Sequence, residues 1–557
     1  MHGRLKVKTT AEQQEAKRKE REKKMKLYNA ATSKIFQKRQ GQEYDQEALE
    51  LTAQILSANS DFYTLWNYRK EIFLAFKEKS TEDELHKLFE DELSFLEACL
   101  KGNPKSYGCW EHRCFVMLTM PCPDWDRELM LCNKYLEYDE RNFHCWDYRR
   151  FVVKRAQVTP EAEFEFTTSK ISSNFSNYSS WHYRSKLLPL IHPDPKHPGG
   201  VKDDVLIKEF ELAQNAFFTD PNDQSAWFYH RWLLGRAEKQ LAIDCVYVSR
   251  ELRRVMVRLS KPAKIGADLS LQVSLDGVQC TGEWTTPANS NDHSLLWLFN
   301  LTAPLDGNEH KVMVAMEGSS RSCTLKDGDE KASSVDEVKP GTLFSYQLSA
   351  ATSDTLTQEL DACQQLYELE PDNKWVLLTI MLLMRAIDPL KYLKETLEHI
   401  DTIIKVDPCR TNYYKDLRSK FLIENAIEEQ GLSAKSVDLS NRELTTLRHT
   451  EYMCTAERID LSNNKLSSLP GCESFQCVKE LELKGNQLKS CEKMECLPLL
   501  EDLSLTDNSI STMEGLRPLT LCSKLKKLNI MGNPLCEQDD FVEELRNMLP
   551  SLDTLIT

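Results

Sequence analysis

The amino-acid sequence predicts a multidomain fold: an all-α solenoid of helical repeats, an all-β sandwich inserted into it, and a C-terminal α/β array of short strands. Three observations support this prediction. A tryptophan-centred signature recurs through the first 240 residues, a middle segment alternates apolar and polar residues, and the last part repeats a leucine-containing pattern about every 22 residues. A chain of 557 residues is long enough for several domains.

The composition is that of a globular protein, with 41% apolar and 28% charged residues. No apolar run approaches the length of a membrane span, and the N-terminal residues contain no apolar segment of a secretory signal. The 18 cysteines are scattered and form no CxxC pair. We therefore expect free thiols in a reducing cytoplasm, no zinc site within this chain and no membrane span.

Charge is distributed unevenly along the chain. Residues 1–40 carry a net charge of +9 and the remainder −24, which makes a total of −15. The acidic remainder argues against a nucleic-acid-binding protein. The basic stretch Lys17–Lys26 is interrupted by glutamates at helical spacing, so it predicts a solvated helix with ion pairs four residues apart. An anionic-surface or import patch is the alternative.

A signature of tryptophan, any residue, tyrosine or histidine, and arginine occurs four times, followed by one variant copy. Its tryptophans, at spacings of 44, 36, 35 and 46 residues, are Trp66, Trp110, Trp146, Trp181 and Trp227. Apolar residues between the copies recur at helical spacing, so each copy predicts a helix pair. A pair of about 35 residues is too small to bury its apolar face alone, and stacked pairs build a solenoid.

The signature also predicts how the second helix of each pair begins. Residues that favour a helix N-cap stand four positions before a tryptophan, at Ser106, Asn142, Asn177 and Asp223. Tryptophan and the arginine three residues later share one face of the predicted helix. We therefore expect the guanidinium group to stack on the indole.

The repeats stop and then resume. The segment around Pro221 has a counterpart around Pro371, 150 residues later, which implies an insertion of roughly 110 residues. Segments in the insertion alternate apolar and polar residues, at 253–260, 268–277, 310–318 and 342–349. About seven short strands at this spacing predict an immunoglobulin-like sandwich, with a small barrel as the alternative.

The C-terminal part fits the consensus of a leucine-rich repeat in five segments, which begin with SVDLSNREL, RIDLSNNKL, KELELKGNQL, EDLSLTDNSI and KKLNIMGNPL. The asparagine-ladder position of the repeat is filled by Arg442, Asn464, Asn486, Asn508 and Asn533. Arginine in the first unit suits an atypical capping repeat. The tail predicts a closing helix. The expected domains are residues 1–40 (basic arm or helix), 41–240 (repeats one to five), 241–350 (insertion), 351–430 (remaining helical repeats) and 431–557 (leucine-rich repeats).

The tryptophan–tyrosine–arginine repeat resembles the repeat of protein prenyltransferase α subunits. The three-part order of helical repeats, inserted sandwich and leucine-rich repeats is similar to that of the type II (Rab) geranylgeranyltransferase α subunits of animals, and it extends over essentially the whole chain. The resemblance implies that this chain is one half of an enzyme. The expected partners are a β subunit that carries a catalytic zinc ion and the lipid pocket, geranylgeranyl diphosphate, Rab GTPases and a Rab escort protein. No nucleic acid is expected.

The resemblance also implies site residues. In the loop GNPKSYGCWEHR, Lys105 and Tyr107 match a lysine and a tyrosine that face the diphosphate, where a mobile ammonium group and a hydroxyl donor stabilise the leaving group. His144 matches a histidine near the diphosphate pocket. Phe143 replaces a tyrosine of farnesyl-type α subunits and so lacks one hydroxyl donor. The alternatives are a solvated loop charge for Lys105, and packing between helix pairs for Tyr107 and His144.

Two further hypotheses come from the sequence. His2, near the N-terminus, is a speculative ligand for the zinc of the β subunit, in an autoinhibitory arrangement; an exposed histidine is the ordinary alternative. The other functional class is an interaction scaffold without a part in chemistry. The inserted and leucine-rich parts carry no group of residues typical of catalysis.

Overall fold

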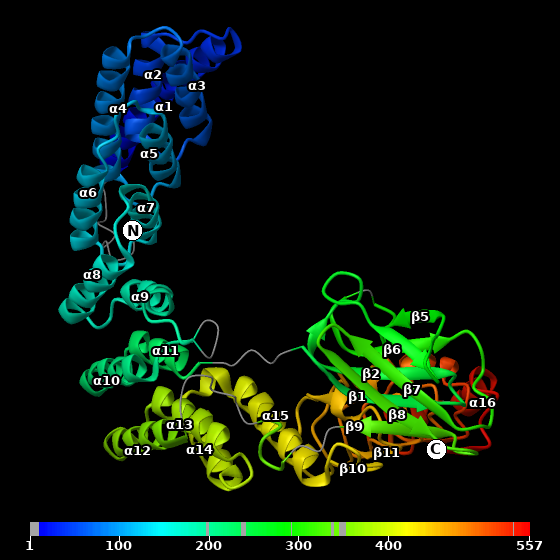
Figure 1. The fold of residues 1–557 in the computed structure, drawn as a ribbon. Helices are drawn as coiled ribbons and strands as arrows, with labels where there is room; N and C mark the ends of the chain where they lie inside the picture. Colours follow the sequence, from blue (N-terminus) through cyan, green and yellow to red (C-terminus); the bar gives the residue numbers. More distant parts are fainter. Residues whose placement is uncertain are drawn as a thin grey trace. The chain divides into compact units, whose positions relative to one another are not determined.

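The computed structural model describes residues 11–195, 200–235, 241–290, 292–335, 339–344, 353–538 and 540–557. His2 lies outside these residues. The chain forms two compact units, residues 1–193 and 194–557 (Figure 1).

The first unit consists of a long helix followed by four helix pairs. In Figure 1 the first helices of the pairs, α4, α6 and α8, follow one another along one side, and α5, α7 and α9 along the other. This arrangement confirms the predicted repeats. The helices are α1 (Ala11–Gln40), α2 (Gln46–Ala58), α3 (Tyr63–Lys77), α4 (Glu82–Gly102), α5 (Tyr107–Thr119), α6 (Trp125–Tyr138), α7 (Phe143–Ala156), α8 (Pro160–Ser173) and α9 (Tyr178–Ile191).

Helix α1 carries the predicted ion pairs between residues four apart, such as Lys24 with Glu20 at 2.7 Å. The predicted N-caps are also confirmed. The side chains of Asn142 and Asn177, for example, accept bonds from the backbone N–H groups of Cys145 and Ser180 in the first turns of α7 and α9. These acceptors satisfy donors that a helix end would otherwise leave unpaired.

In the second unit the helical repeats continue on both sides of the insertion. The amide Nδ2 of Asn373, the N-cap of α13, donates to the Pro221 carbonyl at 2.9 Å, just as Asn142 donates to the Pro104 carbonyl at 2.9 Å in the first unit. The predicted resumption of the repeats is therefore confirmed. The helices are α10 (Asp203–Thr219), α11 (Gln224–Leu233), α12 (Ser353–Leu369), α13 (Lys374–Ile387), α14 (Leu393–Val406) and α15 (Thr411–Gln430).

The insertion is a sandwich of two antiparallel sheets, as predicted, and not a closed barrel. Its sheets have the orders β5-β6-β2-β1-β9 and β4-β3-β7-β8, and apolar residues such as Val246, Val257 and Val314 fill the space between them. The strands are β1 (Ile243–Ser249), β2 (Arg254–Ala263), β3 (Gln272–Leu275), β4 (Val278–Gln279), β5 (Gly282–Thr285), β6 (Ser294–Leu301), β7 (His310–Met316), β8 (Ser319–Leu325) and β9 (Lys331–Val335).

The strand predicted at 342–349 is wrong where the structure can test it. Thr342, Leu343 and Phe344 form no strand, and the rest of that segment lies outside the described residues. The Glu428 carboxylate accepts hydrogen bonds from the backbone N–H groups of Gly341 and Phe344. Phe344 is buried in the same core as α15 and the leucine-rich repeats. Its apolar character therefore reflects this packing and not a place in a sheet.

The C-terminal part is a parallel sheet of three-residue strands, and it confirms the leucine-rich repeats. Each ladder asparagine bonds two repeats: Asn486, for example, donates to the carbonyls of Leu461 and Leu483 and accepts from the Leu466 N–H group. The strands are β10 (Ser436–Asp438), β11 (Arg458–Asp460), β12 (Glu480–Glu482), β13 (Asp502–Ser504), β14 (Lys527–Asn529) and β15 (Thr554–Ile556). The predicted closing helix is α16 (Phe541–Met548), and β15 follows it as one more strand.

Within the second unit the inserted sandwich packs against the leucine-rich repeats (Figure 1). Side chains alternate across a strand, so Val246 and Val248 face the sandwich core while Tyr247 points outward. Tyr247, Met256 and other outward residues form a buried cluster with Cys454 and Cys477 of the leucine-rich part. The two β-containing parts therefore share an apolar contact that the sequence alone did not predict.

Candidate functional site

A row of aromatic residues marks where the second helices begin. The first residue of each of α3, α5, α7 and α9 is aromatic and stands three positions before the signature tryptophan. These residues are Tyr63, Tyr107, Phe143 and Tyr178, which are exposed by 56%, 57%, 51% and 48%. The indole of each tryptophan donates to a carbonyl six residues earlier, as Trp110 does to Pro104 at 2.9 Å. The indole thereby fixes the loop that carries the aromatic residue.

The polar residues of the signature hold buried glutamates. Glu92 on α4 accepts from Arg69 on α3 at 2.8 Å and lies 2.8 Å from the ring of His112 on α5. In the next repeat, Glu128 accepts from both Arg113 and the Tyr148 hydroxyl. The arginine of one repeat and the tyrosine or histidine of the next therefore hold the same carboxylate. These groups join the repeats and are not available for chemistry.

The electrostatics of this network follow from burial and pairing. Burial disfavours the charged carboxylate of Glu92, but Arg69 and His112 outweigh it and lower the pKa of Glu92 to about 2. Burial lowers the pKa of His112 below its ordinary value.

The predicted stacking of guanidinium on indole is wrong for three repeats. The guanidinium groups of Arg69, Arg149 and Arg184 lie over the rings of Phe95, Phe166 and Phe164, at 4.7, 3.5 and 3.7 Å. For Arg69 and Arg149, the glutamate of the next repeat directs the arginine away from the tryptophan of its own helix.

Lys105 lies in the loop before α5 with an exposed side chain. Its ammonium nitrogen is 3.3 Å from a carboxylate oxygen of Asp139, at the end of α6. The preceding residue is held firmly, because the Pro104 carbonyl accepts from both Trp110 and Asn142. The ammonium group of Lys105 is therefore at the end of a flexible side chain on a fixed backbone. It has one acidic partner, Asp139, which the sequence did not predict.

Tyr107, Phe143 and His144 come together at the adjoining starts of α5 and α7. The Tyr107 and His144 rings meet edge to face with centroids 4.2 Å apart, and the Phe143 ring lies 3.9 Å from that of His144. His144 is buried and Tyr107 exposed. Burial is the main cause of a lowered pKa for His144, so the ring is neutral near pH 7.

Tyr107 and His144 also line a cavity of about 370 Å³. Its other walls come from α3, α5 and α7, and they include Tyr63, Glu111 and Asp147. Sequence reasoning missed these three residues. The signal for Tyr63 was its position three residues before Trp66, which matches that of Tyr107 before Trp110.

The cysteines of the chain are not arranged for catalysis or metal binding. Burial raises the pKa of the Cys114 thiol, in the wall of this cavity, to about 12, so it stays protonated at neutral pH. All 18 cysteines are free thiols. The described ranges contain no cluster of three or more His, Cys, Asp or Glu side chains that could hold a metal ion.

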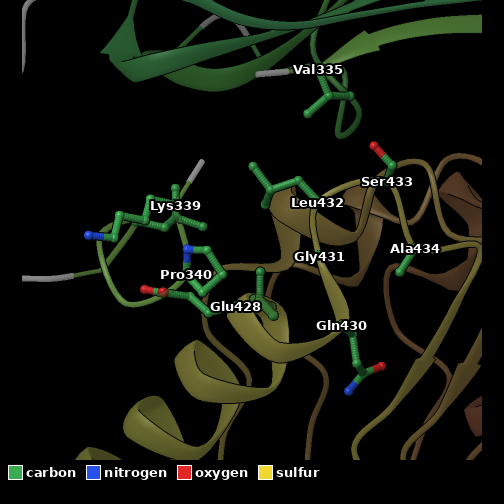
Figure 2. A pocket seen from close by; sticks show the side chains of 11 residues that line it. Val335, Lys339, Pro340, Glu428, Gln430, Gly431, Leu432, Ser433 and Ala434 are labelled. Atoms are coloured by element: carbon green, nitrogen blue, oxygen red, sulfur yellow. The ribbon is translucent and has the colours of Figure 1, made fainter. Parts of the chain in front are cut away.

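A second cavity, of about 460 Å³, lies at the end of α15 (Figure 2). Its lining includes Lys339, Pro340, Glu428 and Leu432. Glu428 is already bound to backbone N–H groups of the segment that returns from the insertion. This carboxylate therefore has a structural role, and the cavity contains no group arranged for catalysis.

Among the helices that the structure describes, none is both long and apolar enough to cross a membrane.

Comparison with known proteins bears on the whole chain. Residues 243–338 match the Rab geranylgeranyl transferase alpha-subunit insert domain, and residues 453–556 match a leucine-rich repeat family. The protein prenyltransferase alpha subunit repeat matches five segments, at 45–76, 89–120, 125–156, 160–191 and 206–237.

Relatives match this chain over its full length. The geranylgeranyl transferase type-2 subunit alpha of Bos taurus is 48% identical over 567 residues, and that of Homo sapiens is 47% identical, each with 100% of both chains covered. A solved structure, Candida albicans protein geranylgeranyltransferase-I complexed with GGPP, is similar at a TM-score of 0.42 and 16% identity, covering 71% of this chain and 91% of that one. The identity to the type-2 subunits extends through the helical repeats, the insertion and the leucine-rich repeats, and the chain belongs to the family of geranylgeranyl transferase type-2 alpha subunits.

Proposed function

We propose that the chain works as one half of a heterodimeric enzyme. The enzyme transfers a geranylgeranyl group from geranylgeranyl diphosphate to cysteines near the C-terminus of Rab GTPases, which an escort protein presents. The observation that carries the proposal is the identity of 48% to a type-2 alpha subunit over the entire chain.

The proposal divides the chemistry between two chains. A zinc ion held by the β subunit would bind the sulfur of the Rab cysteine and lower the pKa of its thiol, so that the cysteine thiolate would be the nucleophile. In the transfer, a sulfur–carbon bond forms while the bond between the allylic carbon and the diphosphate oxygen breaks. The diphosphate leaves with additional negative charge. This chain supplies groups that stabilise that charge.

Three features support a role of the α5–α7 end in stabilising the leaving group. Lys105 offers an exposed ammonium group, and Tyr107, two residues later, is an exposed residue with a hydroxyl donor. The first turns of α5 and α7 add helix N-termini, which favour anions. Asp139 pairs with Lys105 in the free chain, and a diphosphate would compete with this single carboxylate for the ammonium group.

Buried His144 supports the position of Tyr107 through the contact of their rings at 4.2 Å. Phe143 is the aromatic first residue of α7, and its ring has no hydroxyl group. A phosphate contact of the third repeat would therefore rest on His144 alone, in addition to those of Lys105 and Tyr107 from the second repeat.

We place the enzyme in the cytoplasm. All 18 cysteines are free thiols, and several lie close together, such as Cys99 and Cys109, each of which donates to a backbone carbonyl. Neighbouring thiols remain reduced in a reducing compartment.

Co-expression with a type-2 β subunit tests the proposal. We expect a soluble one-to-one complex that transfers geranylgeranyl to a Rab GTPase in the presence of escort protein. Neither chain alone should do so. If no complex forms, or if the β subunit is equally active alone, the chain is an interaction scaffold and the proposal is wrong.

A further inference from the structure

A groove separates α4 and α6 on the side of the first helices of the pairs. It encloses about 630 Å³, and Tyr135 in its lining contacts Trp110 in the lining of the Tyr107 cavity, with ring centroids 5.6 Å apart. The floor of the groove is apolar and includes Leu100, Leu131 and Tyr135.

Polar contacts close the groove at both ends. At one end Arg127 on α6 bonds Glu97 on α4 at 3.3 Å. At the other end Asn142 donates to the Pro104 carbonyl at 2.9 Å. These contacts hold the two helices at a fixed separation, so the groove exists before anything binds in it.

Large apolar side chains at the rim of the groove are exposed to solvent. Tyr138 is 79% exposed and Met130 65% exposed, and both line the groove. Apolar side chains grouped around a concave surface are typical of a protein-binding site.

The charges of the groove are not balanced. Its two acidic residues are paired, Glu97 with arginines and Asp139 with Lys105. Lys101 on α4 and Lys134 on α6 also line the groove, and within the described part of the chain neither ammonium group has a carboxylate within 4.0 Å. On a chain with a net charge of −15, this groove offers two unneutralised positive charges beside an apolar floor.

We propose that this groove binds an amphipathic helix of a partner protein, with bulky apolar side chains on one face and carboxylates beside them. Two parallel helices with an apolar floor accept a third helix, whose residues i, i+3, i+4 and i+7 enter the groove. The carboxylates would pair with Lys101 and Lys134. The first ten residues of this chain do not fit, because they include Arg4, Lys6 and Lys8 and no acidic residue.

A peptide selection with the purified full chain tests the proposal. The probe is a phage-displayed library of helical peptides about 16 residues long, or roughly four turns. Enriched peptides should combine apolar residues at helical spacing with Asp or Glu. The best peptide is then synthesised, and its affinity is measured by fluorescence anisotropy for the wild type and for the double variant Lys101→Glu/Lys134→Glu. We expect the double variant to bind at least roughly tenfold more weakly, and Met130→Asp to weaken binding as well.

The matched control is Lys77→Glu/Lys154→Glu, which makes the same charge change at exposed lysines outside the groove. It should bind within about twofold of the wild type. The proposal is overturned if no peptide is enriched, if the enriched peptides lack acidic residues, or if Lys101→Glu/Lys134→Glu binds as tightly as the control. Binding of anionic phospholipid vesicles or of geranylgeranyl diphosphate that depends on the two lysines, without peptide binding, also overturns it. The readout is binding alone, so it is independent of transferase activity.

Discussion

The ring nitrogen Nε2 of His230 lies 2.7 Å from a carboxylate oxygen of Glu359, and 129 residues separate the two in the sequence. Both side chains are buried. His230 stands three positions after Trp227, where the other copies of the signature have an arginine that holds the glutamate of the next repeat. Here histidine performs that role, and the contact continues the repeats across the insertion.

We expect His230→Ala to loosen the joint between α11 and α12. In the wild type the buried Glu359 carboxylate has two partners, His230 and Gln214. The variant leaves it with Gln214 alone, at 2.8 Å. Removing one partner of a buried charged group costs about 3 kcal/mol. Hydrogen exchange of the α12 backbone amides should accelerate accordingly, because this method reports the free energy of local opening.

The control for this prediction is His230→Arg, which restores the residue type of the other repeats. It should retain most of the protection of α12, since a guanidinium group can reach the same carboxylate. Equal acceleration in the Ala and Arg variants would mean that the ring contributes only packing volume.

The local features of the repeats could be predicted from sequence because they depend on near neighbours. An N-cap such as Asn142 bonds residues within the next turn, and the ladder asparagines recur at the period of the repeat. The partner of Arg69 could not be predicted in this way. Glu92 lies 23 residues away on another helix, and only the packing of two repeats brings them together.

Alternation of apolar residues misled the prediction at Phe344 for the same reason. A buried loop residue can be as hydrophobic as a strand residue, so the sequence does not distinguish the two. The hydrogen bond from the Phe344 backbone N–H group to Glu428 shows that Phe344 belongs to a loop. At the candidate site, the family resemblance assigned Tyr107 and His144 to the same site, and in the structure their rings are in contact. The pairing of Lys105 with Asp139 depends on tertiary structure, which spacing does not encode.

Lys105→Ala in the heterodimer should lower kcat for geranylgeranyl transfer by roughly 10- to 100-fold. On the proposed function the ammonium group would stabilise the leaving diphosphate, so its loss should affect the chemical step more than the binding of the Rab substrate. Single-turnover kinetics with saturating geranylgeranyl diphosphate measure this step directly.

Lys154→Ala is a suitable control because Lys154 is an exposed lysine in the last turn of α7, at the opposite end of this helix from Phe143 and His144. Its kcat should equal that of the wild type. An unchanged single-turnover rate in Lys105→Ala would assign the lysine to the solvated surface.

Gly108→Ala should destabilise the first unit, although alanine favours helices more than glycine does. A Cβ atom at residue 108 would lie 2.5 Å from Cδ1 and 2.7 Å from Nε1 of the buried Trp66. Trp66 is held by its bond to the Ser60 carbonyl at 2.7 Å, so it cannot move without losing that contact. Overpacking of this kind costs about 1 to 3 kcal/mol, more than the gain of about 1 kcal/mol in helix propensity.

The chain provides a matched control in Gly102, the last residue of α4, where a new Cβ atom would meet nothing within 4 Å. Gly102→Ala should leave the denaturant midpoint unchanged or raise it slightly. A Gly108→Ala variant as stable as Gly102→Ala would show that Trp66 adjusts at no cost.

His449 should make the second unit less stable as the pH rises. Its ring lies 3.0 Å from Glu424 on α15 and 3.6 Å from Glu451. Burial disfavours the charged ring, but the two carboxylates outweigh it and raise the pKa of His449 above its ordinary value. The folded state therefore holds its proton more tightly than the unfolded chain. The resulting stabilisation is fully present below the unfolded value of about 6.5 and is lost as the pH rises through the higher folded value.

The measurement compares the wild type with His449→Gln by hydrogen exchange of α15 at several pH values. The difference between the two should be largest near pH 6 and should shrink as the pH rises. His399 on α14 provides the opposite case, because burial lowers the pKa of its ring and favours the neutral form. The contribution of His399 should grow with rising pH, so His399→Gln should differ from the wild type more at pH 8 than at pH 6. Parallel trends for the two histidines would contradict the assignment of Glu424 and Glu451 as partners of a charged His449.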